Sequence, residues 1–331
     1  MPNWGEVLNQ VRAIDNPHDL VRRNYLTSLN EYTGRDVLLY SSGWTHLAGT
    51  SPHTSMIDAD MQGIMEAFSG LDGDELDLII HSPGGSPGAA ESIVDYIRTK
   101  YDDVRIFVPH AAMSAATMVA CAGDELVMGR HSFLGPIDPQ ITLDTPTGKR
   151  PVPAAAILSQ FKQAREDIDE DESNLAHWTP IIRQYGPGLL QECEQAMDLS
   201  KELAQTWAED HLLSHQTEAD QLAKELANEL TDYEKFKSHS RHLHRGRARD
   251  IGFEIEDLED DDDLQDLVLS IYHATTLTHE NRNIAKIIET HQGNSFIIGA
   301  PQQNQAGGGA SIEIPDKRLP GGPPQPEDPN F

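Results

Sequence analysis

The feature that most constrains the fold is a regular alternation of apolar strands and amphipathic helices between residues 36 and 128. The segments that predict strands are DVLLYSSGW, DELDLIIH, VRIFVP and ELVMG, and those with helical spacing are SMIDADMQGIMEAF, AESIVDYIRTK and SAATMVACAG. Strands that alternate with helices of about 10 to 15 residues predict right-handed βαβ crossovers and a mainly parallel sheet. We therefore expect an α/β fold in which DELDLIIH, an almost continuous apolar run, is a central strand.

The later part of the chain predicts a different organisation. With 331 residues, the chain can form one large domain with an appendage, or two domains. The pattern becomes long and helical from about Pro153, and the composition shifts near His215. We expect a helical N-terminal lead-in (1–34), an α/β domain (35–215), a helical C-terminal subdomain (216–300) and a disordered tail rich in Gly, Pro and Gln (301–331).

Composition limits the classes of partner. The net charge is −29, with 54 acidic against 25 basic residues, and such a surface repels nucleic acid and anionic lipid. Cys121 and Cys193 fall in predicted helices and form no CxxC pair, which fits a reducing compartment. The N-terminus lacks the apolar stretch of a signal peptide, and no run of about 18 apolar residues occurs. We expect a cytoplasmic protein without a transmembrane segment.

A histidine-rich segment and an acidic run are the two places in the sequence where a metal site could lie. His239, His242 and His244 follow no fixed ligand spacing, and the arginines between them repel a cation. The acidic run EDLEDDDD lacks the glycine and the terminal glutamate of an EF-hand loop. We therefore expect neither a metal nor a cofactor.

The turn HSPGGSPGAA, residues 81–90, joins the central strand to the next helix. A Gly-Gly pair at this position lets backbone N–H groups face a ligand where a side chain would block them. Pro83 and Pro87 would hold the loop in one shape. A Gly- and Pro-rich turn is also a common plain connector, so a second feature is needed to indicate function. We expect Gly84 and Ser86 to contact a substrate.

Ser114 supplies that second feature. It follows the next strand after one short turn and begins a helix of small residues. A serine there either caps the helix or acts as a nucleophile at the carboxyl edge of the sheet. Ligands collect outside the carboxyl ends of parallel strands, and the Gly84–Gly85 turn comes off the same predicted edge. The backbone N–H groups of Gly85 and Ala115 could then bind one oxyanion.

These motifs carry a family resemblance. SPGG after one strand, MSAATMVACAGDELVM after the next, and then SFLGPIDPQ resemble the Clp/crotonase superfamily of serine peptidases, and within it the serine dehydrogenase proteinase family, related to signal peptide peptidase A. The resemblance is strongest over residues 35–143. It implies a Clp/crotonase-like βαβ superhelix and a homo-oligomer that cleaves peptide or protein substrates. It also implies Ser114 as nucleophile and the N–H groups of Gly85 and Ala115 as the oxyanion hole.

The resemblance leaves the general base open. In the Clp branch the base is a histidine at the end of the strand after the nucleophile helix, and LGP, residues 134–136, occupies that place here. His131 precedes SFLG, so we expect it at the surface. The missing histidine favours the Ser-Lys branch of the superfamily.

Lys162 is the expected base. It lies after Ser114 on a predicted helix, with Leu158 and Phe161 near its own face, and the Ser-Lys relatives place their lysine similarly. Burial must lower the lysine pKa from about 10.4 so that the amine can accept a proton. Glu166 lies one turn later and would favour the charged form, so Lys149 and Lys201 stay open as alternatives.

We therefore predict a serine endopeptidase with a Ser114–Lys162 dyad, in which Ser114 attacks a peptide carbonyl and lysine moves the proton to the leaving amine. One alternative is a catalytically inactive oligomeric scaffold of the same fold. Another is acyl-CoA chemistry of the crotonase kind, which needs two N–H groups and a carboxylate, such as that of Asp138, but no serine.

Overall fold

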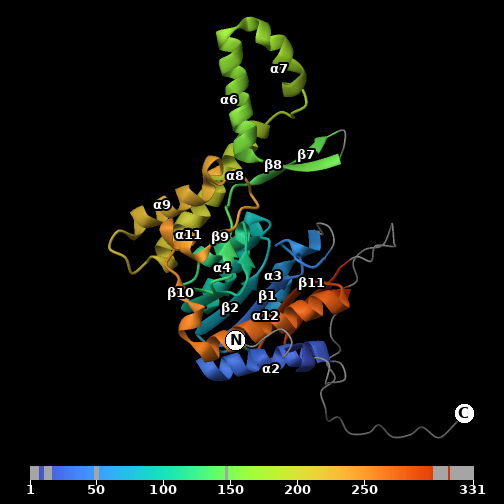
Figure 1. Cartoon of the computed structure of the whole chain (residues 1–331), viewed down its shortest axis with the longest axis vertical. Helices are drawn as coiled ribbons and strands as arrows, with labels where there is room; N and C mark the ends of the chain where they lie inside the picture. Colours follow the sequence, from blue (N-terminus) through green and yellow to red (C-terminus); the bar gives the residue numbers. More distant parts are fainter. Residues whose placement is uncertain (1–6, 11–16, 48–51, 146–147, 301–311, 314–331) are drawn as a thin grey trace, which may run out of the picture.

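The computed structural model describes residues 7–10, 17–47, 52–145, 148–300 and 312–313 (Figure 1). Its centre is an eight-stranded sheet in the order β10-β5-β3-β2-β1-β11-β12-β13. The parallel strands are β1 (Asp36–Ser42), β2 (Glu75–His81), β3 (Asp103–Val108), β5 (Glu125–Met128) and β10 (Glu256–Asp257). The antiparallel additions are β11 (Ile284–Thr290), β12 (Ser295–Gly299) and β13 (Ile312–Glu313). The expected α/β fold with parallel central strands is confirmed.

Helices cover both faces of the sheet (Figure 1). One face carries α3 (Asp60–Ala67), α4 (Pro87–Lys100), α5 (Ala115–Cys121) and α8 (Leu189–Trp207), and the other carries α2 (Pro17–Thr33) and α12 (Asp262–Arg282). Successive side chains of β2 alternate between these layers: Leu78 and Ile80 belong to the first core, and Ile79 belongs to the second. This two-sided burial explains why DELDLIIH is apolar at nearly every position.

The turn after β2 ends where α4 begins, and its residues account for that boundary. The hydroxyl of Ser86 accepts a hydrogen bond from the backbone N–H of Ala89 at 3.3 Å, and Pro87 occupies the first turn. Arg98 and Lys100 lie in the last turn, where cations are favoured by the helix dipole. The second half of SPGGSP is therefore a helix start.

A small second sheet ties the C-terminal part of the chain to the segment before Ser114. It contains β4 (Ala111–Ala112), β6 (Phe133–Leu134) and β9 (Leu243–His244), with β4 parallel to β6 and β6 antiparallel to β9. Residues around position 240 are thereby brought to the carboxyl edge of the main sheet, although they are more than a hundred positions from Ser114 in the sequence.

An arm extends from the body of the molecule (Figure 1). It begins with a hairpin of β7 (Gln140–Thr145) and β8 (Gly148–Pro153), which the helical pattern of this region did not predict. It continues through α6 (Ala154–Glu170) and α7 (Leu175–Ile182), and α8 returns to the sheet. The helices α6, α7 and α8 lie in the segments where the sequence predicts them.

The predicted helical subdomain over 216–300 is only partly helical. It contains α9 (Ala219–Thr231), α10 (Tyr233–Phe236) and α11 (Arg245–Asp250), followed by α12. Its last part forms β11 and β12, a hairpin that continues the main sheet, because its isoleucines pair beside β1. Most of the predicted tail over 301–331 lies outside the described residues. Within the described part of the chain, no helix is long and apolar enough to cross a membrane.

Candidate active site

The turn after β2 is held between two neighbouring segments by backbone hydrogen bonds. On one side, the N–H of Ser82 donates to the carbonyl of Ala111 at 3.0 Å, and the N–H of Met113 donates to the carbonyl of Ser82 at 2.9 Å. On the other side, the N–H of Met56 donates to the carbonyl of Gly84 at 2.7 Å. The turn therefore runs beside the residues that lead into Ser114.

Both glycines are required by close backbone contacts. Gly84 has φ +85°, and a Cβ there would lie 2.3 Å from the carbonyl oxygen of Met113 and 2.7 Å from the backbone nitrogen of Ala115. Gly85 has φ +158°, and a Cβ there would lie 2.2 Å from the carbonyl oxygen of Met56. Contacts of this length exclude any side chain. The predicted convergence of the Gly84–Gly85 turn and Ser114 is confirmed.

Ser114 has the backbone of a residue under strain. Its φ of 52° and ψ of −122° lie outside the regions that L-residues favour, and such conformations collect at functional sites. It precedes α5, but its hydroxyl makes no capping hydrogen bond. The residues that follow, Ala115 and Ala116, are small and buried. The half-buried hydroxyl thus stands at the carboxyl edge of the sheet without a capping task.

Two backbone donors belong to the segments that meet at Ser114. Gly85 is the central residue of a parallel bridge to Met56, so its own N–H points away from Met56. The N–H of Ala115 belongs to the first turn of α5, where intrahelical acceptors are missing. Among the described residues, neither N–H has a hydrogen-bond acceptor. Two free donors near a serine hydroxyl have the composition of an oxyanion hole.

A buried ion pair fixes the segment that clamps Gly85. The ammonium of Lys286, fully buried, donates to both carboxylate oxygens of Asp60 at 2.6 and 2.7 Å and to the carbonyl of Ser55 at 2.7 Å. The hydroxyl of Tyr40 donates to the same carboxylate at 2.7 Å. Burial lowers the pKa of Lys286, and Asp60 opposes that shift. This cluster holds Ser55, the neighbour of Met56, in one position.

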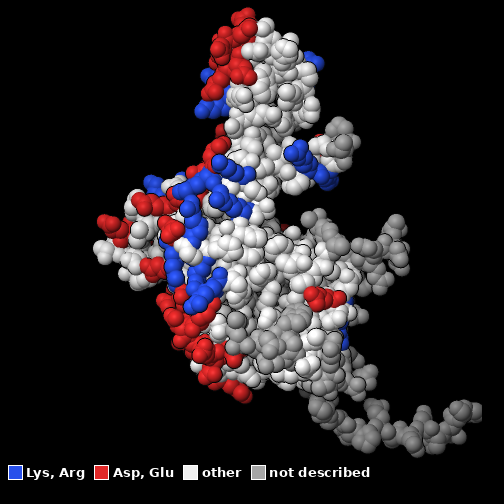
Figure 2. Space-filling view, in the orientation of Figure 1, with Lys and Arg blue, Asp and Glu red and all other residues white. Residues whose placement is uncertain are grey.

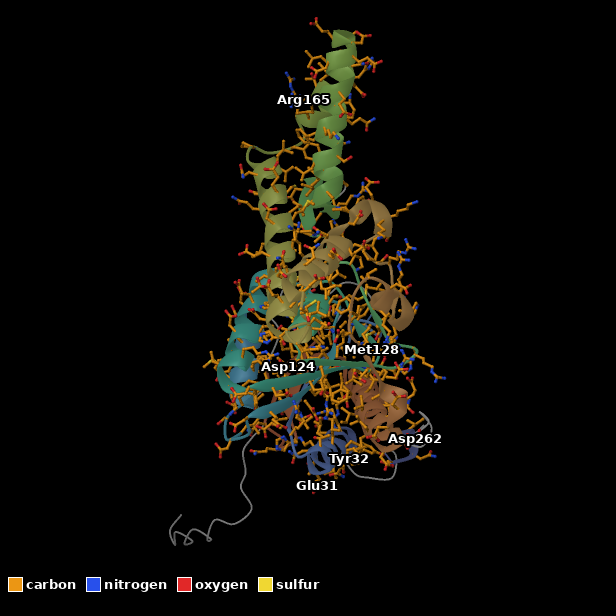
Figure 3. The ribbon with its side chains drawn as sticks, turned by 90° about the vertical axis from the view of Figure 1, so that its left-hand side faces the viewer. Glu31, Tyr32, Asp124, Met128, Arg165 and Asp262 are labelled. Carbon is orange, nitrogen blue, oxygen red and sulfur yellow. The ribbon has the colours of Figure 1, made fainter. Side chains whose placement is uncertain are left out.

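Lys162 lies away from this site. It is on α6, roughly 12 Å along the helix axis from Ala154 at a rise of about 1.5 Å per residue. Its side chain is 77% exposed and faces Glu166 at 3.8 Å. Figure 3 shows Arg165, on the same helix, high on the arm and distant from Met128 in the sheet. No hydrogen bond or ion pair joins Lys162 to Ser114 in the described structure.

The other two lysines also lack a contact with Ser114. Lys149 is exposed on β8, opposite Asp144 in the hairpin. Lys201 is partly buried on α8. Of the remaining predicted residues, Ser86 uses its hydroxyl to cap α4 and its N–H to bind the carbonyl of Met56 at 3.0 Å. His131 is exposed, as expected.

The sequence analysis did not identify an aspartate–histidine pair that the fold assembles. Nδ1 of His239 lies 2.8 Å from Oδ1 of Asp138, whose side chain is 2% exposed. The other oxygen of Asp138 accepts from the amide of Gln140 at 2.8 Å. With Nδ1 donating to the carboxylate, Nε2 of His239 is free to accept a proton. The side chain of His239 remains 30% exposed, so a substrate can reach it.

The aspartate–histidine pair lies close to the segments around Ser114. Three positions before Asp138, the N–H of Gly135 donates to the hydroxyl of Thr117, one turn into α5, at 3.0 Å. A Cβ on Gly135 would stand 2.4 Å from the terminal methyl of Met113, the residue before Ser114. The pairing of β6 with β9 sets Leu243 and His244, which follow His239 by four and five positions, beside Leu134 and Phe133. The signal in the sequence was Asp138 in GPIDPQ together with a His-rich segment, but no spacing rule connects them.

A second group of histidines borders the apolar cluster that contains Met113, since His81 stacks on Trp44 and His110 contacts Phe133. Burial, with a contribution from His110, lowers the pKa of His81 well below its ordinary value. Burial also lowers the pKa of His110 to about 4, and its ring accepts from or donates to the Tyr272 hydroxyl at 2.9 Å. Because successive residues of a strand alternate in direction, His81 faces α12, whereas Ile80 and the Ser114 segment belong to the other core. Burial therefore keeps both imidazoles neutral near pH 7.

Comparisons with known proteins identify a family and two partial relatives. A family model described as ClpP-like SDH-type serine proteinase matches residues 56–261, more than half of the chain. Two uncharacterized proteins of Methanocaldococcus jannaschii are similar: MJ0137 is 35% identical over 115 residues, 34% of this chain and 37% of that protein, and MJ1495 is 31% identical over 147 residues, 42% and 48%. The chain thus spans less than half the length of each of these relatives.

Solved structures show a weaker likeness. The 1510-N membrane-bound stomatin-specific protease, in one mutant form, has a TM-score of 0.38 and 15% identity and covers 64% of this chain and 79% of its own. Another mutant form, in complex with a substrate peptide, has a TM-score of 0.36 and 17% identity and covers 61% and 70%. The family match covers residues 56–261. This range includes the Gly84–Gly85 turn, Ser114, Asp138 and His239. This chain belongs to the ClpP-like SDH-type serine proteinase family.

Proposed function

We propose that this protein is a serine peptidase that hydrolyses peptide bonds with Ser114 as nucleophile. The observation that carries the proposal is the close approach of Gly84 to Met113, Ser114 and Ala115, which joins the two segments that carry the free N–H groups of Gly85 and Ala115. Such donors stabilise the negative charge that develops on the substrate carbonyl oxygen, and loss of one costs on the order of 100- to 1000-fold in turnover.

We assign the general base to His239, oriented by Asp138. The hydroxyl of Ser114 attacks the peptide carbonyl, and Nε2 of His239 takes the hydroxyl proton. The imidazolium is stabilised by the buried carboxylate of Asp138 and then protonates the leaving amine. A water, deprotonated by the same imidazole, releases the acyl group and restores the Ser114 hydroxyl.

The Ser114–Lys162 dyad is the competing assignment for the base. An exposed ammonium that faces a carboxylate lacks the desolvation that would favour its neutral form, and Lys162 is exposed beside Glu166. The dyad would also require α6 to bring Lys162 back toward the sheet. The aspartate–histidine pair follows Gly135, which contacts Met113 and Thr117 on either side of Ser114, and this proximity is why we favour it.

Hydrolysis of an unfolded protein tests the function. Casein incubated with the wild-type chain should yield new N-termini, and Ser114→Ala should abolish them while the circular dichroism spectrum stays the same. Equal cleavage by both proteins would assign the hydrolysis to another source. Intact casein with both proteins would favour the inactive scaffold, in which the fold serves only for assembly.

We also propose that the arm mediates assembly into a homo-oligomer. Leu175 and Ile181 of α7 are 55% and 36% exposed, beside an apolar groove of about 670 Å³ between α6 and α8. Exposed apolar side chains that gather on a projecting element are typical of subunit contacts. Leu175→Asp should lower the molar mass measured by light scattering, whereas Leu222→Asp, 36% exposed on α9, should leave it unchanged. An unchanged molar mass for both variants would show that Leu175 of the arm does not mediate assembly.

A further inference from the structure

The distribution of charge in this acidic chain has one clear exception. Residues 235–249, KFKSHSRHLHRGRAR, contain lysine and arginine at six positions and no acidic residue, although the whole chain carries a net charge of −29. Figure 2 shows Lys and Arg side chains gathered in a band over β9 and α11, with acidic side chains to its left and below it. A basic surface bordered by acidic ones focuses the field on one place.

Half of these cations are neutralised by carboxylates. Arg245 pairs with Glu259 at 2.5 Å and with Asp257 at 3.2 Å. Arg249 also pairs with Asp257, and Lys235 pairs with Glu229. Each of these three cations is paired with a carboxylate, so together they leave no net positive charge for a ligand.

The other three cations have no carboxylate partner among the described residues. They are Lys237, Arg241 and Arg247, and all three are exposed. The guanidinium of Arg241 is oriented by hydrogen bonds to the carbonyls of Lys235 at 3.0 Å and Phe236 at 3.3 Å. Arg247 is on α11. Two arginines thus remain available for an anion.

Both arginines line a concave site. A pocket of about 110 Å³ lies between α10 and the β9–α11 segment, and its lining is Lys235, Phe236, Arg241, His242, Leu243 and Arg247. Phe236 and Leu243 are buried, so they form an apolar floor beneath the charged groups. Arginine guanidinium groups bind planar carboxylates in a bidentate way, and a pocket of this size admits a carboxylate but excludes a folded domain.

The pocket adjoins the proposed active site. The ring of His242 stacks on that of Phe133 with 3.8 Å between centroids, and Phe133 shares an apolar cluster with Met113, the residue before Ser114. His239, the proposed base, precedes Arg241 by two positions. A peptide whose scissile bond lies at Ser114 can therefore extend a neighbouring residue toward the pocket.

We propose that this pocket binds a carboxylate of the peptide substrate, and that Arg241 and Arg247 select it. The inference rests on the proposed peptidase function and names its substrate class: peptides with an acidic side chain, or with a free C-terminus, near the scissile bond. Both sources present the same planar anion to the two guanidinium groups.

The test measures binding with the Ser114→Ala protein, so that it does not depend on hydrolysis. The probes are fluorescein-labelled heptapeptide mixtures, randomised at three positions on each side of one fixed residue, which is Glu or Gln. A second pair fixes an alanine C-terminus as carboxylate or amide. We expect fluorescence anisotropy to show about tenfold tighter binding for at least one carboxylate form, since charge-assisted hydrogen bonds are roughly twice as strong as neutral ones. The pair that shows the difference identifies the source.

Arg247→Gln should reduce that preference to less than twofold. Arg183→Gln, a matched change at an exposed arginine that follows α7 on the arm, should preserve it. Equal affinity for charged and neutral probes, or a preference that survives both Arg241→Gln and Arg247→Gln, would overturn the proposal. Carboxylate selectivity without casein cleavage by the wild-type protein would retain the pocket and reject the peptidase, so the two failures are distinguishable.

Discussion

Gly84 lies so close to Ser114 that a Cβ at position 84 would stand 2.8 Å from the Ser114 Cβ. The two residues follow different strands, β2 and β3 with the short β4, and they meet because those strands are neighbours with parallel direction. The contact joins the loop that carries one proposed oxyanion donor to the residue that we propose as nucleophile. The proposed chemistry depends on it.

Gly84→Ala should lower peptide hydrolysis by roughly 100-fold or more, because the new methyl collides with backbone atoms and moves the oxyanion donors. Gly70→Ala is the matched control: Gly70 has φ +84°, close to the +85° of Gly84, but its Cβ would meet nothing nearer than 3.6 Å. Both variants bear the cost of positive φ, about 1–2 kcal/mol. Comparable activity in the two, measured as kcat/KM on one peptide, would contradict the site.

His239→Ala should reduce kcat by roughly 100- to 10,000-fold, the range for loss of a general base. Asp138→Asn should produce a loss of similar order, because an amide can hold the imidazole in the wrong tautomer. Lys162→Met should leave kcat within about twofold, since its side chain is 77% exposed and pairs with Glu166. The reverse outcome, a large loss from Lys162→Met with His239→Ala still active, would establish the Ser-Lys dyad.

Lys286→Met should destabilise the fold by about 3–5 kcal/mol, since it leaves the carboxylate of Asp60 buried without its cation. The double variant Lys286→Met, Asp60→Asn should recover part of that loss, because it removes both charges. Lys162→Met, which breaks the exposed pair with Glu166, is the control. It should change the free energy of unfolding by less than about 1 kcal/mol. Urea unfolding monitored by tryptophan fluorescence measures all three. Equal changes in the two lysine variants would show that burial of the pair is not decisive.

Stability should fall as the pH drops from about 6.5 toward about 4. Burial lowers the pKa of His279 to about 4, and its ring lies 2.8 Å from the carbonyl of Ile284 and 3.1 Å from the hydroxyl of Ser41. The unfolded chain binds more protons than the folded one between these values, so stability is fully present above about pH 6.5 and decreases below it. His279 alone accounts for roughly 3 kcal/mol of this decrease.

The contribution of His279 is measured by variants. His279→Gln should flatten the pH dependence of the urea midpoint between pH 7 and pH 4.5, even though the variant is less stable at pH 7. His177→Gln, at an exposed position on α7, should keep the wild-type slope. An identical slope in both variants would show that His279 is not a source of the acid sensitivity.

Sequence patterns predicted the centre of the fold and the meeting of the Gly84–Gly85 turn with the Ser114 segment. The strand–turn–helix around Gly84 and Gly85, and the serine at the start of α5, are local features: each is determined by residues within a few positions, and parallel strands must end at one edge. Their proximity therefore followed from chain order. The hairpin of β11 and β12 did not follow, because a short isoleucine-rich run is compatible with a helix until its pairing with β1 is known.

The aspartate–histidine pair could not be predicted from local sequence patterns. Asp138 and His239 meet only because β9 pairs with β6, a contact between segments that no periodicity connects. Lys162 was favoured from its position after Ser114, but whether α6 packs on the sheet or leaves it depends on the β7–β8 hairpin, which no pattern predicted. Glu166 lies four positions after Lys162, and this spacing is the local feature that indicates an exposed lysine paired with a carboxylate.

The most direct test of the central claim is labelling with a fluorophosphonate, which reacts with a serine hydroxyl only where a base and an oxyanion hole activate it. We predict that the wild-type protein gains one phosphonyl adduct, that peptide mapping locates it on Ser114, and that Ser114→Ala and His239→Ala proteins gain none. A wild-type protein that stays unlabelled, or an adduct that persists in the Ser114→Ala protein, would contradict the account.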